Sequence, residues 1–122
     1  MYDPVCACTE EADEPTIVVL CGSTRFMDAM VEANVQETAA GRIVLAPGCD
    51  LKTPHPLWAD PAYVEALKPR LDALHRAKIR LAHEVLVVGD YIGDSTRAEI
   101  EYARQLGKPV RYTHPAVEES AK

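Results

Sequence analysis

Short aliphatic runs alternate along the chain with longer segments in which apolar residues recur at helical spacing. The runs at residues 16–21, 42–47, 84–89 and 109–112 are typical of buried strands. The amphipathic segments predict helices over about 25–40, over a stripe that spans 64–81, and from about 95 to 106. The chain therefore reads as four strands connected by three helices.

A proline lies inside the second helical segment. Its apolar stripe consists of Val64, Leu67, Leu71, Leu74 and Leu81. Pro69 predicts either a kink in this segment or a short helix followed by a second one that begins near Pro69. Gly41 and Gly107 are expected to end the first and third helices.

This alternation predicts a parallel sheet that is covered by helices on both faces. We therefore expect a single-domain, three-layer α/β fold of the Rossmann or flavodoxin-like type over residues 16–114. Residues 1–15 are expected to form a flexible leader, and residues 115–122 a tail. Ligands bind such sheets beyond the carboxyl ends of the strands, where the loops at 22–25, 48–60 and 90–96 are expected.

Composition narrows the range of partners. The chain has 122 residues, 48% of them hydrophobic, 26% charged, and a formal net charge of −6. No apolar run is long enough for a membrane span, and no signal peptide is recognisable, which favours a cytoplasmic location. Scattered basic residues argue against binding to a nucleic acid polymer, but one arginine and a helix N-terminus are enough for a small phosphorylated ligand.

The four cysteines do not form a recognisable disulfide or zinc pattern. Buried, unreactive cysteine is the default expectation for these residues, and no metal or cofactor is assigned. An alternative from another class is a metal-binding protein that uses Cys6, Cys8, Cys49 and His55, although the regular CxxC spacing is missing.

The first strand ends in Gly22-Ser23-Thr24-Arg25, which is neither a GxGxxG fingerprint nor a phosphate loop. Ser23, Thr24 and the adjacent amides could bind a phosphate or a ribose together with Arg25. Equally, Ser23 or Thr24 could cap the helix while Arg25 stays solvated. The residues alone leave both interpretations open.

Glu99 is the second candidate. Tyr102, Ala103 and Leu106 follow it at helical spacing, so it heads an apolar stripe rather than the solvent face. A carboxylate in that position is costly to bury unless it has a function. The alternative is a capping box, in which Thr96 caps the helix and Glu99 bonds back to its start.

Two further groups could contribute to a site. Asp72 and His75 lie three residues apart on the second helix, where His75 could exchange protons near neutral pH. The simpler alternative is a surface face. Trp58 lies in the proline-rich loop and could stack on a base or anchor a lid.

Two segments and the order of elements between them carry a family resemblance. The segments are VVLCGSTRF (18–26) and KIRLAHEVLVVGDYIGDSTRAEIEYARQLGKPVRY (78–112). They resemble the nucleoside 2-deoxyribosyltransferase superfamily, which includes 2′-deoxynucleoside 5′-monophosphate N-hydrolases. The likeness covers most of residues 16–112, and its most specific part is STRAEIEYARQLGKPV.

The resemblance implies roles for several residues. It places the nucleophilic glutamate of the family on Glu99. The family usually has an aspartate on the preceding helix as the acid that assists the leaving base. That position falls on His75 here, a departure from the family, with Asp72 one turn away. A second aspartate of the family falls on Asp90 or Asp94. By the same resemblance Ser23, Arg25 and Ser95 would hold a 5′-phosphate or sugar hydroxyls, and paired subunits would complete the site in at least a homodimer.

The sequence thus predicts N-glycosidic cleavage or deoxyribosyl transfer on a nucleoside or nucleoside 5′-monophosphate. The alternative is a module on the same fold that binds a nucleotide without turning it over.

Overall fold

The computed structural model describes residues 14–121, and within them it contains one four-stranded parallel sheet. The strands lie side by side in the order β3-β2-β4-β5. Their bounds are Ile17–Cys21 for β2, Ile43–Leu45 for β3, Glu84–Val87 for β4 and Val110–Tyr112 for β5. The predicted parallel α/β fold is confirmed.

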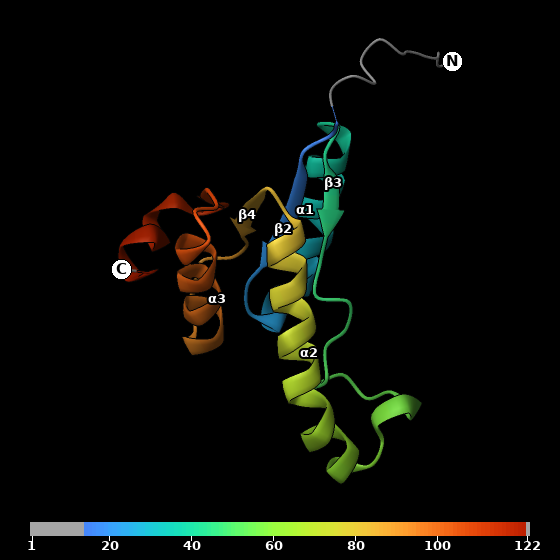
Figure 1. The fold of residues 1–122 in the computed structure, drawn as a ribbon. Helices are drawn as coiled ribbons and strands as arrows, with labels where there is room; N and C mark the ends of the chain where they lie inside the picture. Colours follow the sequence, from blue (N-terminus) through green and yellow to red (C-terminus); the bar gives the residue numbers. More distant parts are fainter. Residues whose placement is uncertain (1–13, 122) are drawn as a thin grey trace, which may run out of the picture.

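Helices cover both faces of the sheet, so the fold has three layers (Figure 1). The α-helices are α1 (Met27–Ala39), α2 (Pro61–Leu81) and α3 (Asp94–Gln105). Short 3-10 helices precede α1 (η2, Thr24–Phe26), precede α2 (η3, Pro56–Trp58) and follow β5 (η4, Pro115–Ala121). Helix α1 lies on one face, and α2 and α3 lie on the other.

The core is divided by the sheet because successive side chains of a strand point to opposite faces. Val18 and Leu20 pack with Met30 and Ala33 of α1. The other core cluster comprises Val19, Cys21, Ile79, Ala82, Val85, Val87, Ile92, Ile100 and Ala103, contributed by the sheet, α2, α3 and the segment between β4 and α3. The last four residues of β2 are completely buried, as the aliphatic run predicted.

The strand order has a functional consequence. The chain runs from β2 outward to β3 and then returns to β4 on the other side of β2. The loops that follow β2 and β4 therefore diverge toward opposite faces and leave a crevice at the carboxyl end of the sheet. Any ligand site is expected there.

Gly22 lets the backbone turn sharply at this point. Its φ is 152°, and a Cβ on it would lie 2.6 Å from the carbonyl oxygen of Val88. The amide of Val88 donates a hydrogen bond to the carbonyl of Cys21 at 2.8 Å. Only glycine fits where the first turn passes so close to the end of β4.

Two sequence expectations need correction at the helices. Helix α2 continues through Pro69, so of the two outcomes predicted for this proline the break into two helices is wrong, and a kink stays a prediction. Helix α3 begins at Asp94 with Gly93 as its N-cap residue, which places Thr96 inside the helix. Since Thr96 is not the cap, the capping-box explanation of Glu99 is also wrong.

Within residues 14–121, no helix is both long and apolar enough to cross a membrane. The greater part of the expected leader lies outside the described residues. Val117 of η4 packs against the core face that carries α2 and α3.

Candidate functional site

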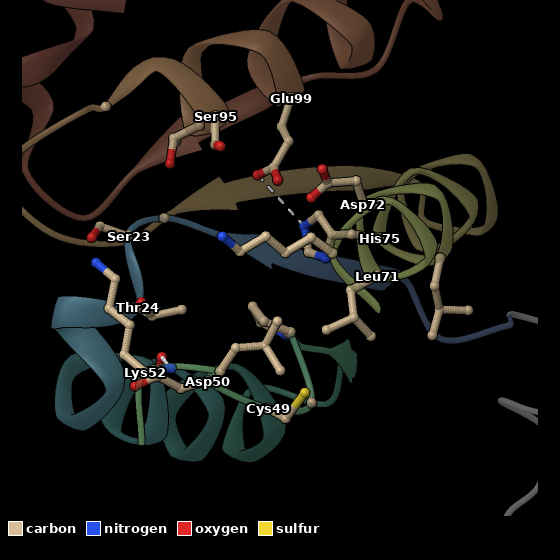
Figure 2. Close-up of a pocket in the computed structure, with 18 of the residues that line it drawn as sticks. Ser23, Thr24, Cys49, Asp50, Lys52, Leu71, Asp72, His75, Ser95 and Glu99 are labelled. Atoms are coloured by element: carbon tan, nitrogen blue, oxygen red, sulfur yellow. Dashed lines mark hydrogen bonds and ion pairs between the residues drawn. The ribbon is translucent and has the colours of Figure 1, made fainter. Parts of the chain in front are cut away.

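A cavity of about 780 Å³ opens at the carboxyl end of the sheet, between the loops that follow β2, β3 and β4 and the side of α2. Figure 2 shows its lining from these separate elements. Eight of the residues predicted for the site line it: Gly22, Ser23, Thr24, Asp72, His75, Asp94, Ser95 and Glu99. The topology thus brings together residues that are far apart in the sequence, since Gly22 and Glu99 are separated by 77 positions.

Glu99 lies in the second turn of α3, and its carboxylate points toward His75 and Asp72 (Figure 2). Its side chain is only 22% exposed. Burial raises the pKa of Glu99 to about 7, and the nearby charge of Asp72 acts in the same direction. Cys21, which hydrogen-bonds to the carboxylate, and Arg76 partly offset this rise in the pKa. Glu99 therefore titrates close to neutral pH.

His75 is buried rather than part of a surface face. Its Nε2 lies 3.3 Å from Sγ of Cys21 and 3.7 Å from a carboxylate oxygen of Glu99. Burial lowers the pKa of His75 to about 4, with a further decrease from the charge of Lys78. The imidazole is consequently neutral at pH 7, and its contact with Glu99 is not an ion pair at that pH.

Cys21 forms the floor of this cluster at the end of β2. The thiol is fully buried, and burial raises the pKa of Cys21 well above its usual value, with Glu99 adding to the rise. The expectation of a buried cysteine is confirmed for Cys21, whereas Cys49 is only partly buried. Its sulfur nevertheless contacts the two ionisable side chains of the site, which the sequence did not indicate.

The turn after β2 presents its polar groups to the cavity. Ser23 Oγ accepts a hydrogen bond from the amide of Arg25 at 3.3 Å, so Ser23 caps η2. Ser23 nevertheless lines the cavity as well, together with Ser95 from the first turn of α3. The N-cap residue Gly93 supplies no side chain to the amides of that turn, which leaves them for solvent or a ligand.

Three residues predicted to bind substrate lie outside the cavity lining. Arg25 stacks over the ring of Tyr91 at 4.3 Å and is exposed. Asp90 is an exposed residue beyond the end of β4. The indole of Trp58 donates a hydrogen bond to the carbonyl of Thr53 and stacks on His55 at 4.6 Å. A role for these three residues in binding stays a prediction.

Cys6 and Cys8 of the alternative metal site lie outside the described residues. The other two residues of that site, Cys49 and His55, have different surroundings. Cys49 lines the cavity, whereas His55 accepts a hydrogen bond from the amide of Leu57 and caps η3.

Sequence reasoning missed the lysines of the cavity. Lys68 and Lys78 lie on the same side of α2 as His75, and Lys52 comes from the loop after β3. The amine of Lys78 also donates a hydrogen bond to the carbonyl of Ala46 at 2.6 Å. Their helical spacing from His75, seven residues before it and three after it, was a signal that could have identified Lys68 and Lys78.

Asp50 was also missed, and it stabilises the loop after β3. The amide of Lys52 and the hydroxyl of Thr53 donate hydrogen bonds to its carboxylate at 3.0 Å each. The bond from the Lys52 amide is the main reason why the pKa of Asp50 lies below its usual value. The carboxylate is therefore ionised at neutral pH and fixes a turn at the rim of the cavity.

The site thus combines a half-buried carboxylate, a neutral imidazole and hydroxyls that line the cavity with the buried thiol of Cys21 behind them, at the switch point of a parallel sheet. No family model matches the chain, and searches of curated proteins and of solved structures likewise find no match.

Proposed function

We propose that this protein cleaves the N-glycosidic bond of a nucleoside or nucleoside 5′-monophosphate, or transfers its deoxyribosyl group, with Glu99 as the nucleophile. The observation that carries this proposal is the position of Glu99. Its carboxylate faces the same cavity as Ser23 and Ser95 and is largely shielded from solvent. The resemblance to nucleoside 2-deoxyribosyltransferases gives the proposal its reaction class.

In the proposed reaction, a carboxylate oxygen of Glu99 forms a bond to C1′ as the bond from C1′ to the base nitrogen breaks. The bonding electrons leave with the base, which takes up a proton from a water molecule that Asp72 or His75 positions. In hydrolysis, the hydroxide left by that water then attacks C1′ and releases the Glu99 carboxylate. In a transfer, a second base attacks C1′ instead and gives its N–H proton to the hydroxide. Asp72 suits this positioning role because it lines the cavity and lies close enough to Glu99 to influence its pKa.

Substrate binding would use the two polar turns at the switch point. Ser23, Ser95 and the uncapped amides at the start of α3 can donate hydrogen bonds to a phosphate or to sugar hydroxyls. Lys52 and Lys68 add positive charge on the other walls of the cavity. The proposal places the activity in the cytoplasm on free nucleosides or nucleotides, in a homodimer or a larger homo-oligomer.

The test is base release by the variant Glu99→Gln. Wild-type protein and variant are incubated, with a metal chelator present, with a panel of 2′-deoxynucleosides and their 5′-monophosphates, and the free base is quantified by chromatography. The variant should lose at least about 100-fold in turnover, because an amide cannot form the glycosyl ester.

Glu101→Gln is the matched control. Glu101 lies on the same helix, is exposed and accepts a hydrogen bond from Gln105 at 3.4 Å. This variant should turn over substrate like the wild type. Equal turnover by wild type and Glu99→Gln would remove Glu99 from the mechanism.

A second candidate function is nucleotide binding without turnover. It is favoured by the protonation state of His75, which occupies the position where the family resemblance implies an aspartate as the acid. Because burial lowers its pKa to about 4, His75 carries no extra proton for a leaving base at neutral pH. Calorimetric binding of a nucleotide by the wild type, with no base released during long incubation, would favour this function over the enzyme.

A further inference from the structure

Three potential metal ligands converge beside the cavity, one each from β2, α2 and α3. They are Sγ of Cys21, Nε2 of His75 and a carboxylate oxygen of Glu99, and all three atoms lie within 4.8 Å of one another. The residues are far apart in the sequence and lie on regular elements, so their arrangement is fixed by the fold rather than by a loop.

The distances suit a tetrahedral ion. Typical zinc bonds are about 2.3 Å to sulfur, 2.0–2.1 Å to nitrogen and 2.0–2.2 Å to oxygen. At tetrahedral angles these bonds place sulfur about 3.6 Å from nitrogen, and nitrogen about 3.3 Å from oxygen. The observed separations are 3.3 Å between Cys21 and His75 and 3.7 Å between His75 and Glu99. The remaining separation, between Sγ of Cys21 and the carboxylate oxygen of Glu99, is within 4.8 Å.

The donor set selects the kind of metal. A thiolate, an imidazole and one carboxylate match the preference of Zn²⁺ for sulfur, nitrogen and oxygen ligands. Calcium and magnesium favour sites made of oxygen atoms and do not suit the thiol. Three protein ligands also leave a fourth position, and the cavity lined by His75 and Glu99 adjoins it.

Without a cation the thiol proton links the three groups. Cys21 and His75 are buried, Sγ of Cys21 lies 3.3 Å from Nε2 of His75, and the thiol hydrogen-bonds to the Glu99 carboxylate. Binding through Nε2 would leave the His75 proton on Nδ1, which is buried and has no partner among the described residues. A metal ion would displace the thiol proton and replace these contacts with three bonds.

We propose that Cys21, His75 and Glu99 bind one Zn²⁺ ion per chain, with the fourth coordination position open to the cavity. This site differs from the one considered from the sequence, since it uses neither Cys6 nor Cys8. The binding itself does not depend on the proposed function. If both proposals hold, zinc and substrate turnover exclude each other, because the Glu99 carboxylate serves both.

Protein purified without an affinity tag and stripped with a chelator provides the test. Titration with Zn²⁺ in a calorimeter should give one site per chain. Replacement by Co²⁺ should produce the visible bands of a tetrahedral site together with a thiolate-to-cobalt charge-transfer band in the near ultraviolet.

Variants decide which thiol is the ligand. The triple variant Cys6→Ser, Cys8→Ser, Cys49→Ser retains Cys21 as its only cysteine, and it should keep both the stoichiometry and the charge-transfer band. The variants Cys21→Val and Glu99→Gln should weaken Zn²⁺ binding, the former by more than about 100-fold. Since the triple variant keeps Cys21 and every other residue of the described core clusters, the test does not require Cys21→Val to fold.

Absence of zinc binding by the wild type, or of the charge-transfer band in the triple variant, would overturn the proposal. Neither result bears on the proposed nucleosidase, which is assayed in the presence of chelator. Conversely, a protein that binds zinc through Cys21 but releases no base would support this site and contradict the proposed function.

Discussion

The three side chains at the centre of the site have pKa values that differ from their usual ones, and burial is the largest cause in each case. Burial raises the pKa of Cys21 and of Glu99, and it lowers the pKa of His75. All three shifts favour the uncharged form, as expected where water is excluded from ionisable groups. Clusters of this kind are enriched at functional sites.

The pKa of Glu99 gives a prediction on stability. In the folded protein this pKa is about 7, against a usual value of 4.5, so the native state binds the proton more tightly than the unfolded chain. The contribution of Glu99 to stability is then fully present below pH 4.5 and is lost as the pH rises to about 7. His75 acts oppositely between pH 4 and 6.5 and partly masks this trend in the wild type.

The variant Glu99→Gln isolates the effect, because its side chain stays neutral at every pH. Measured by urea denaturation in the presence of chelator, it should gain stability relative to the wild type as the pH increases from 4.5 to 7. The gain should approach about 3 kcal/mol and then level off. Glu101→Gln should show no such trend, and a constant difference between Glu99→Gln and the wild type would contradict the assigned burial.

At the scale of elements, α2 contributes most to the site. Lys68, Asp72, His75 and Lys78 all line the cavity from one side of this helix. The sequence allowed this helix to be predicted, and the Asp72–His75 pair with it. The burial of His75 was not predictable, because its helical neighbours Arg76 and Arg80 equally suggested a solvated face. What buries it is the contact with Cys21 of β2, which only the fold brings close.

Pro69 limits the stability of α2. It is exposed, lies inside the helix and has no amide to donate to the carbonyl four residues earlier. The first turns of α2 extend past the end of the sheet in Figure 1. Most residues between 61 and 70 are exposed, so little packing compensates for the lost hydrogen bond.

The variant Pro69→Ala should therefore stabilise the helix by about 1–3 kcal/mol. Hydrogen exchange should show slower exchange of the amides between residues 62 and 72. Pro61→Ala is the control, since Pro61 occupies the first turn, where proline is favourable, and this variant should bring no gain. Unchanged exchange in Pro69→Ala would show that packing, rather than the backbone, determines the stability of this end of α2.

At the scale of the whole molecule, the topology explains why the site is where it is. The aliphatic runs were sufficient to predict four parallel strands and the edge of the sheet at which loops converge. They could not give the order β3-β2-β4-β5, which places the switch point beside β2. That order brings Glu99 of α3 into the same cavity as the turn at Gly22 and Ser23.

Side chains that follow no regular pattern could not be placed from the sequence. Trp58 and Arg25 were predicted to bind the ligand, and this stays a prediction. In the structure Thr53 and His55 contact the indole, and Tyr91 contacts the guanidinium. Such local contacts depend on loop conformation, which the pattern of the sequence did not indicate.

The most direct test of the proposed function is the detection of a glycosyl group on Glu99. Metal-free protein is mixed with the 2′-deoxynucleoside or 5′-monophosphate that it cleaves fastest, quenched in acid and digested with trypsin, and peptide 98–104 is analysed by mass spectrometry. We expect this peptide to carry one deoxyribosyl or phosphodeoxyribosyl group, with fragmentation assigning it to Glu99 rather than Glu101. Base release with this peptide unmodified at every quench time, or with the sugar attached to another residue, would contradict the account.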